Sequence, residues 1–205
     1  MGQVKLTKGE LKRQRDCLRQ YERYLPTLQL KKQQLQMEIL WQVTLLSEKK
    51  HILNKKKEAV LVWGGLLAEP VINLKGWLVP SNIVTTVKNI AGIELPVFER
   101  VDFLEAEYDL FETAPWVDFA IEALRQVVSS RKEVEALEEG IGILKYELRI
   151  TTQRVNLFEK IKIPEAQKTI HLIKIYIGDQ MANAVGRSKI AKRKIEEGVL
   201  EGAGV

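Results

Sequence analysis

Apolar residues recur every seven positions between Leu11 and Val60, and this repeat predicts a long helix. Steps of seven from Leu11 reach seven apolar residues and one lysine: Leu11, Leu18, Leu25, Lys32, Ile39, Leu46, Leu53 and Val60. The companion positions, three further on, are Gln14, Tyr21, Leu28, Leu35, Gln42, Lys49 and Lys56. A heptad repeat forms a stripe that packs against another long helix. At about 1.5 Å per residue, such a helix spans about 75 Å.

A second stripe follows Pro115 and predicts the partner helix. Its members are Ala120, Ala123, Val127, Ser130, Val134, Leu137, Ile141, Leu144, Leu148, Thr151, Val155 and Phe158. It resumes with Ile163, Ala166, Ile170, Ile173, Ile177, Gln180 and Ala184. Eight residues separate Val155 from Ile163, where the repeat requires seven, and Pro164 follows directly. We expect a local kink or unwinding there that resets the register.

The segment between the two stripes has a different pattern. Two β-rich runs joined through Ala91 and Gly92 predict a hairpin over residues 82–101, with Ile90 leading into the turn. Pro96 cannot donate a ladder hydrogen bond, which makes the second run an edge strand. Since an isolated hairpin is marginal in water, it must pack on a helix or another chain. Four aromatic residues are expected mainly as core of this insertion: Trp63, Trp77, Trp116 and Phe119.

The helix ends complete the predicted organisation. Thr7 and Glu10 have the spacing of a capping box, with Thr7 accepting from the backbone N–H of Glu10 and Glu10 reaching back. Pro26 predicts a bend near residues 22–26 without a reversal. The fold class is therefore mainly α: a long antiparallel two-helix coiled coil formed by the N- and C-terminal segments, with a small central insertion. The first helix covers residues 1–68, the insertion 69–114, the second helix 115–197 and a disordered tail 198–205.

Charge is distributed unevenly along the chain. Residues 1–60 contain 14 basic and 6 acidic residues, a net of +8, whereas residues 61–115 contain 3 and 8, a net of −5. Basic helices attract nucleic acid in some proteins, but the sequence has no recognisable nucleic-acid-binding motif. The longest apolar run, about residues 59–68, is too short to cross a bilayer, and no signal-type segment opens the chain. With Cys17 as the single cysteine, a cytoplasmic protein is expected.

The sequence contains no recognisable active site. No phosphate-binding loop is present, so direct nucleotide binding is not supported. His51 and His171 have no second ligand at helical spacing, and neither is expected to bind a metal. Cys17 flanks the first stripe and is expected to be a packing residue. We therefore expect no catalytic residue, no cofactor and no metal.

Three stretches resemble the D subunit of V-type and A-type rotary ATPases. The strongest is Ile150–Ile170, where the family-like positions are Thr151, Thr152, Arg154, Val155, Asn156, Glu159, Ile163 and Pro164. The others are Asn89–Phe98, similar to the family's hairpin tip, and the entry LTKGEL with the later LKKQQL. Pro26 departs from the family pattern. The polar groups of Thr151, Thr152 and Asn156 either contact partner subunits or bond within the seam and the preceding turn.

The resemblance implies a central rotor shaft that binds no nucleotide itself. The paired termini would sit inside a ring of A and B catalytic subunits, and the hairpin end would face the membrane. There the small F subunit and a socket subunit on the membrane rotor would join it, with no direct membrane insertion and no nucleic acid. Exposed cations would form the bearing against the ring: Arg187, Lys189, Lys192, Arg193 and Lys194. The protein would be peripheral to the membrane within a membrane-bound complex.

Two interpretations from other classes remain open on the residues alone. A prefoldin-like chaperone also pairs two helices around β-hairpins, although its helix tips expose apolar residues, whereas both ends here are basic. A basic coiled-coil scaffold is the other alternative. Co-purifying partners separate the three: nucleotide-binding subunits, sister coiled coils, or nucleic acid.

Overall fold

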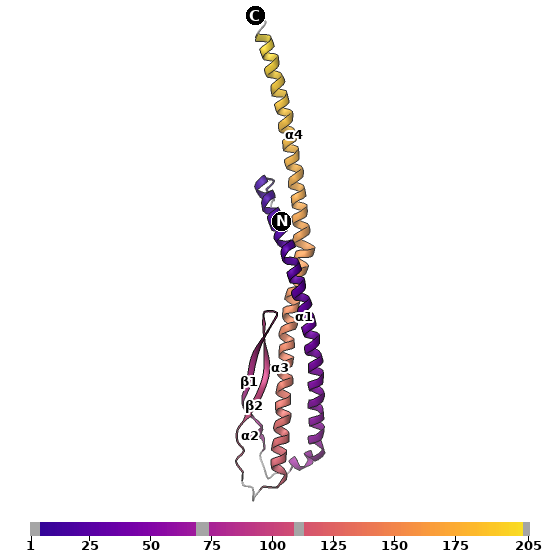
Figure 1. The fold of residues 1–205 in the computed structure, drawn as a ribbon, viewed down its shortest axis with the longest axis vertical. Helices are drawn as coiled ribbons and strands as arrows, with labels where there is room; N and C mark the ends of the chain where they lie inside the picture. Colours follow the sequence, from indigo (N-terminus) through magenta and orange to yellow (C-terminus); the bar gives the residue numbers. More distant parts are fainter. Residues whose placement is uncertain (1–4, 69–73, 109–112, 203–205) are drawn as a thin grey trace. The chain divides into compact units, whose positions relative to one another are not determined.

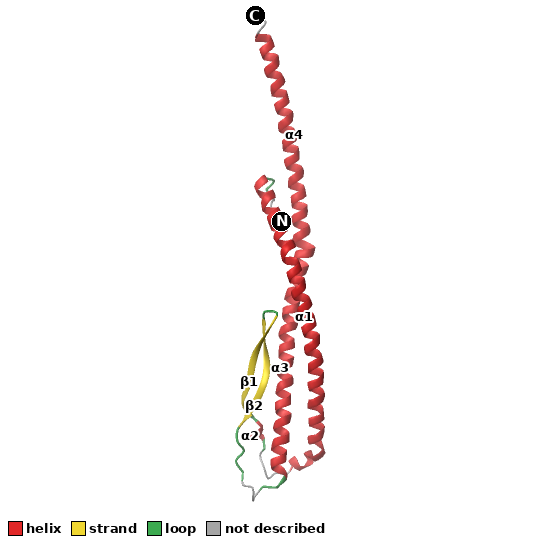
Figure 2. Ribbon diagram, viewed as in Figure 1, coloured by secondary structure: helices red, strands yellow, loops and turns green. Residues whose placement is uncertain are grey.

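The computed structural model describes residues 5–68, 74–108 and 113–202. In chain order the main elements are α1 (Lys8–Trp63), α2 (Lys75–Leu78), β1 (Pro80–Ile90), β2 (Ile93–Phe103), α3 (Trp116–Asn156) and α4 (Ile163–Gly202). A 3₁₀ turn, Gly64–Ala68, ends α1, and a π-helical turn, Leu157–Lys162, joins α3 to α4. The hairpin is the one strand pair among the described residues, and helices make up nearly all of the rest (Figure 2).

The chain forms two compact units, each built from two separate stretches of helix. Unit 1 comprises Met1–Leu30 with Thr152–Val205, and unit 2 comprises Lys31–Thr151. Helix α1 continues through Pro26, so this proline does not break the helix. All positions of the predicted α1 stripe are buried or half-buried, which confirms the heptad pattern.

In unit 2, α1 and α3 run antiparallel. Lys31 pairs with Glu147 at 3.6 Å and Lys49 with Glu133 at 2.6 Å, so rising numbers in α1 meet falling numbers in α3. The Lys56 ammonium also donates to the Ser130 hydroxyl at 2.8 Å. Helix α3 begins at Trp116, directly after Pro115, with Asp118 in its positively polarised first turn.

The hairpin runs alongside α3 in Figure 1, and its buried residues also contact α1. Leu95 of β2 forms a buried cluster with Leu35 of α1 and Leu144 of α3, and the turn residues Ile90 and Ala91 pack against it. The predicted hairpin and its turn are confirmed. The expected packing of the hairpin on a helix is also observed, because the turn lies against α1 and α3.

The turn geometry explains the two residues found there. Ala91 has φ 53° and Gly92 φ 78°, so both adopt the left-handed conformation of a two-residue hairpin turn. The Asn89 side chain accepts from the Gly92 N–H at 3.1 Å and braces the turn. Pro96 lies opposite Val87 in the ladder. Both strands of a two-stranded sheet are edge strands, and an edge strand tolerates a proline, which has no N–H to donate.

A second apolar cluster lies at the base of the hairpin. Leu74, Val117 and Ile121 are buried, and Trp77, Tyr108 and Trp116 pack around them. Phe119 departs from the expected core position: 64% of it is exposed, and it meets Trp63 only edge-on, with ring centroids 6.0 Å apart. The reason is helical phase, because Phe119 falls outside the α3 stripe that its buried neighbours occupy.

In unit 1, α1 and α4 also run antiparallel. The start of α1 lies beside residues 176–187 of α4, and Tyr21 stacks on Phe158 with ring centroids 5.3 Å apart. Val155, Ala166, Ile170 and Ile173 are buried in this seam. Half of the predicted capping box is present: the Glu10 N–H donates to the Thr7 hydroxyl at 3.2 Å. The Glu10 carboxylate accepts instead from Gln14 at 2.8 Å.

The predicted stripe of α4 ends earlier than expected. Gln180 and Ala184 are exposed, as is every residue from Gly178 to Glu197. The physical reason is that α1 begins at Lys8: its first residues reach α4 near residues 176–187, and within the described ranges no partner helix runs along α4 beyond them. Helix α4 itself runs to Gly202, which includes part of the expected tail, and residues 203–205 lie outside the described residues.

Candidate partner-binding surfaces

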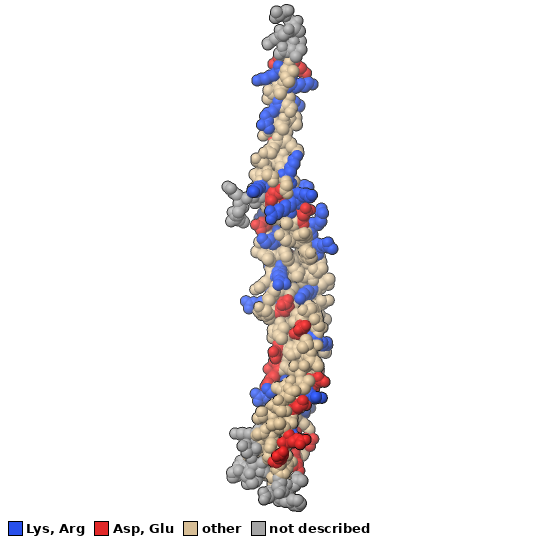
Figure 3. All heavy atoms as spheres, turned by 90° about the vertical axis from the view of Figure 1, so that its left-hand side faces the viewer, with Lys and Arg blue, Asp and Glu red and all other residues tan. Residues whose placement is uncertain are grey.

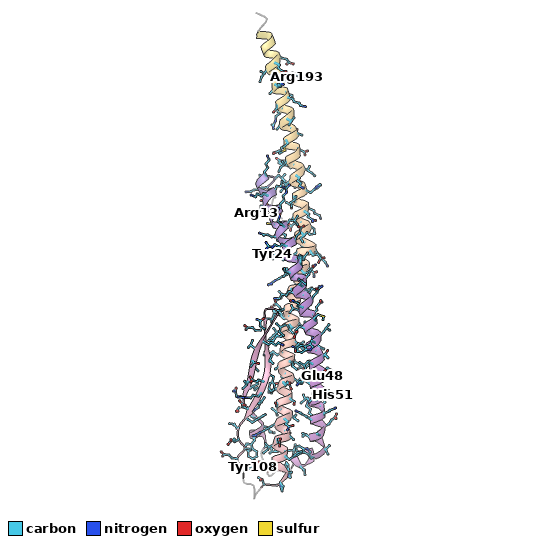
Figure 4. The ribbon with its side chains drawn as sticks, viewed as in Figure 1. Arg13, Tyr24, Glu48, His51, Tyr108 and Arg193 are labelled. Carbon is cyan, nitrogen blue, oxygen red and sulfur yellow. The ribbon has the colours of Figure 1, made fainter. Side chains whose placement is uncertain are left out.

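The exposed segment of α4 carries the five predicted bearing cations. Lys192 pairs with Glu196 at 3.7 Å and Arg193 with Glu197 at 3.6 Å, each one turn along the helix. Arg187 lines a shallow groove of unit 1 with Leu6 and Thr7. Basic side chains stand out from this segment in Figure 3, and Arg193 points away from the helix in Figure 4. Exposed pairs of this kind contribute about 0–1 kcal/mol each, so a partner can replace them at little cost.

The same segment also exposes apolar side chains. Met181, Val185, Ile190 and Ile195 are each more than half exposed. A protein interface combines an apolar centre, which becomes buried on binding, with a charged rim. This segment of α4 exposes residues suited to both parts. The predicted stripe of α4 ends at Ala184 and included none of these four residues.

The extra residue before Pro164 is accommodated by the π-helical turn. The Ile163 N–H donates to the carbonyl of Phe158, five residues earlier, instead of four. A π-turn inserts one residue into a helix, which accounts for the eight-residue step. Pro164 has no N–H, and its ring would clash with the carbonyl four residues earlier in a regular α-helix. The π-helical turn therefore accounts for the predicted unwinding, and it also accommodates Pro164 without the clash.

The family-like positions divide by exposure. Thr151 and Val155 are buried, Thr152, Ile163 and Pro164 are half-buried, and Arg154, Asn156 and Glu159 are exposed. The Thr151 hydroxyl is buried without a hydrogen-bond partner among the described residues, so it bonds neither across the seam nor to the preceding turn. The side chains of Arg154 and Asn156 are accessible to another chain.

Arg125 ties the base of the hairpin to α3, which the sequence patterns did not predict. Its guanidinium donates to the carbonyl of Trp77 at 3.2 Å and to that of Leu104 at 2.5 Å. It also lies 5.2 Å from the ring centre of Phe103. One side chain of α3 thus holds the backbone on both flanks of the hairpin.

Tyr108 forms a further link between the segment after β2 and α3. Its hydroxyl donates to the carboxylate of Asp118 (Tyr108 is labelled in Figure 4). This hydrogen bond, with partial desolvation and the negative charge of Asp118, raises the pKa of Tyr108. On α3, the pKa of Glu135 is lowered, chiefly because Lys132 donates a hydrogen bond to its carboxylate.

The described residues offer no other obvious chemistry. No three His, Cys, Asp or Glu side chains gather among them in a metal-binding arrangement. Of the helices described, none combines the length and the apolar character needed to cross a bilayer. His51 and Glu48 are neighbours along α1 in Figure 4 and form no such cluster.

Comparison with known proteins identifies the family. The family model for the D subunit of ATP synthase matches residues 10–193. The V-type ATP synthase D subunit of Borreliella burgdorferi is 43% identical over 195 residues, which cover 95% of this chain and 96% of that protein. The corresponding V-type ATP synthase proteins of Chlamydia pneumoniae and Chlamydia trachomatis serovar L2 are 35% and 32% identical, covering 95% and 96% of this chain and 94% and 98% of theirs. The match favours the rotary ATPase resemblance over a prefoldin-like chaperone, and the chain belongs to the ATP synthase D-subunit family.

Proposed function

We propose that this chain is the central rotor shaft of a V/A-type rotary ATPase, and that it transmits torque between the catalytic ring and the ion-translocating membrane rotor. Membership of the D-subunit family supports this proposal, together with the paired helices in each unit. A shaft needs torsional stiffness, and a heptad seam supplies it because interlocked side chains resist rotation of one helix about the other. The chain has no catalytic role in this proposal; ATP chemistry belongs to the A and B subunits.

The observation that carries the proposal is the exposed segment of α4. From Gly178 to Glu197 every residue is exposed, and the segment is basic, with apolar side chains interspersed. We assign it to the bearing inside the A and B ring, through Arg187, Lys189, Lys192, Arg193 and Lys194. Weak, exchangeable ion pairs suit a bearing, because none of them fixes a single angle.

The remaining assignments follow the same proposal. The hairpin side of unit 2 would associate with the small F subunit and with the socket subunit of the membrane rotor. The complex would be membrane-bound, with this chain peripheral on the cytoplasmic side and with no contact to nucleic acid. In this proposal, residues 1–68 and 115–197 form the helical shaft. Residues 69–114 form the insertion that carries the hairpin.

Truncation after Ile177 tests the bearing. The buried seam of unit 1 ends at Ile173 and Ile177, so the shortened chain retains its packed residues. The A and B subunits, co-expressed with it, should assemble poorly or hydrolyse ATP without ion transport. Wild-type coupling between hydrolysis and transport would refute the assignment.

Two variants test other parts of the shaft. Deletion of residues 83–99 removes the hairpin and leaves the α4 segment, so ring assembly should persist while the ATPase rate or the coupling changes. Loss of ring binding by a folded deletion variant would contradict this. Pro164→Ala should alter coupling, because it removes the residue that favours the π-turn, and unchanged coupled transport would count against a role for that turn.

A further inference from the structure

A cavity lies in unit 2 between the hairpin and the two helices. Its volume is about 160 Å³, and α1, both strands and α3 contribute to its walls. Its principal lining residues are Trp41, Leu45, Leu95, Phe98, Ala136 and Gly140. Leu95 and Gly140 at its floor are buried, whereas Trp41 and Lys88 at its rim are exposed, so the cavity is partly open to solvent.

A second observation, at Gly140, supports the presence of empty space. This glycine is buried, yet a Cβ built on it would meet no atom within 4 Å apart from its chain neighbours and the nearby backbone of its own helix. Ala136 lies one helical turn earlier and also faces the cavity. Because Ala136 and Gly140 have almost no side chain, they leave space between α3 and the hairpin. Neither Leu95 nor Phe98 fills this space.

The charges at the edge of the cavity define what can enter it. The Lys88 ammonium lies 5.6 Å from the centre of the Trp41 ring. Glu133 is paired with Lys49 at 2.6 Å. Because both charges already have partners, they do not call for a charged ligand, and the remaining wall is mainly apolar and aromatic.

We propose that this cavity is a binding site for a small uncharged aromatic molecule of about one ring. An apolar cavity of about 150 Å³ in another protein binds benzene, and ligand sites in general are apolar with a few polar groups. The ligand would touch β2, α1 and α3 together. It would therefore favour the docked hairpin, since a ligand stabilises the state that binds it. This site does not depend on the proposed rotor function.

The test uses the full chain and fluorobenzene as the probe, followed by ¹⁹F NMR line broadening. Gly140→Leu places a side chain in the cavity and should weaken binding about tenfold or more. Gly142→Leu is the matched control: it lies on the same helix, is exposed and has open space around it, so binding should persist.

A second variant protects the test against misfolding. Gly140→Ala adds one carbon into open space and favours the helix, so it should fold and bind fluorobenzene more weakly than Gly142→Ala. Absence of binding to the unmodified chain would overturn the proposal. Equal binding by the Gly140 and Gly142 variants would also overturn it, because the probe would then occupy another apolar surface.

Discussion

Replacing Thr151 with valine should stabilise the protein. Thr151 is 1% exposed, and its hydroxyl has no hydrogen-bond partner among the described residues. A buried donor left unsatisfied costs about 1–3 kcal/mol. Valine has nearly the same shape, the same branching at Cβ and a similar helix propensity, so Thr151→Val removes the penalty without opening a cavity.

The free energy of unfolding should rise by about 1–2 kcal/mol. This is the lower part of the range for a buried unsatisfied group, because a hydroxyl is a weaker polar group than a charge. For a chain of this size, 1 kcal/mol corresponds to about 2–4 °C in Tm, so the Tm should rise by about 2–8 °C. Urea unfolding followed by circular dichroism measures the change, with the m-value compared to confirm that the same surface unfolds.

Thr152→Val is the matched control. Thr152 is the next residue on the same helix, but it is half-buried, so water can reach its hydroxyl and its replacement should change stability by no more than about 0.5 kcal/mol. A Thr151→Val protein that is equal to or less stable than the unmodified chain would refute the reasoning. That result would mean the hydroxyl is satisfied in solution.

Three further predictions concern the hairpin. Arg125→Met should lower hairpin stability by about 1–2 kcal/mol, because two carbonyls lose a charged donor; amide exchange in β1 and β2 measures this, and Arg131→Met, with its exposed side chain, should leave it unchanged. Gly92→Ala should cost about 1 kcal/mol, since φ is 78° there; unaltered thermal unfolding would contradict it. The raised pKa of Tyr108 means that its bond to Asp118 stabilises the fold below the ordinary tyrosine pKa and is lost as pH rises through the folded value. Tyr108→Phe should therefore show a smaller loss of stability in alkaline urea titrations than the unmodified chain, and identical alkaline profiles would exclude this link.

Periodic features of the fold were predictable from the sequence. The α1 stripe, the hairpin turn at Ala91 and Gly92, and the extra residue before Pro164 each follow from local spacing, and the structure agrees with all three. Spacing suffices in these cases because helix and strand periods are intrinsic to the backbone.

Features that depend on distant residues were not predictable. The seam of unit 1 ends near Ile177 because α1 begins at Lys8, and the α4 pattern alone continues past that point. Arg125 reaches the backbone 48 and 21 residues away, and no periodic pattern encodes such a bond. The candidate bearing cations were inferred from charge and family resemblance, and their role remains a prediction.

The π-helical turn at Leu157–Lys162 has a consequence for insertions and deletions. Each residue rotates an α-helix by about 100°, so one residue removed from a regular helix would turn Ala166, Ile170 and Ile173 away from α1. At this turn the surplus residue is already absorbed. A chain that lacks one residue of Leu157–Lys162 and carries alanine in place of Pro164 would keep those side chains in phase as a plain α-helix, so the helix can change length at this joint without losing its seam.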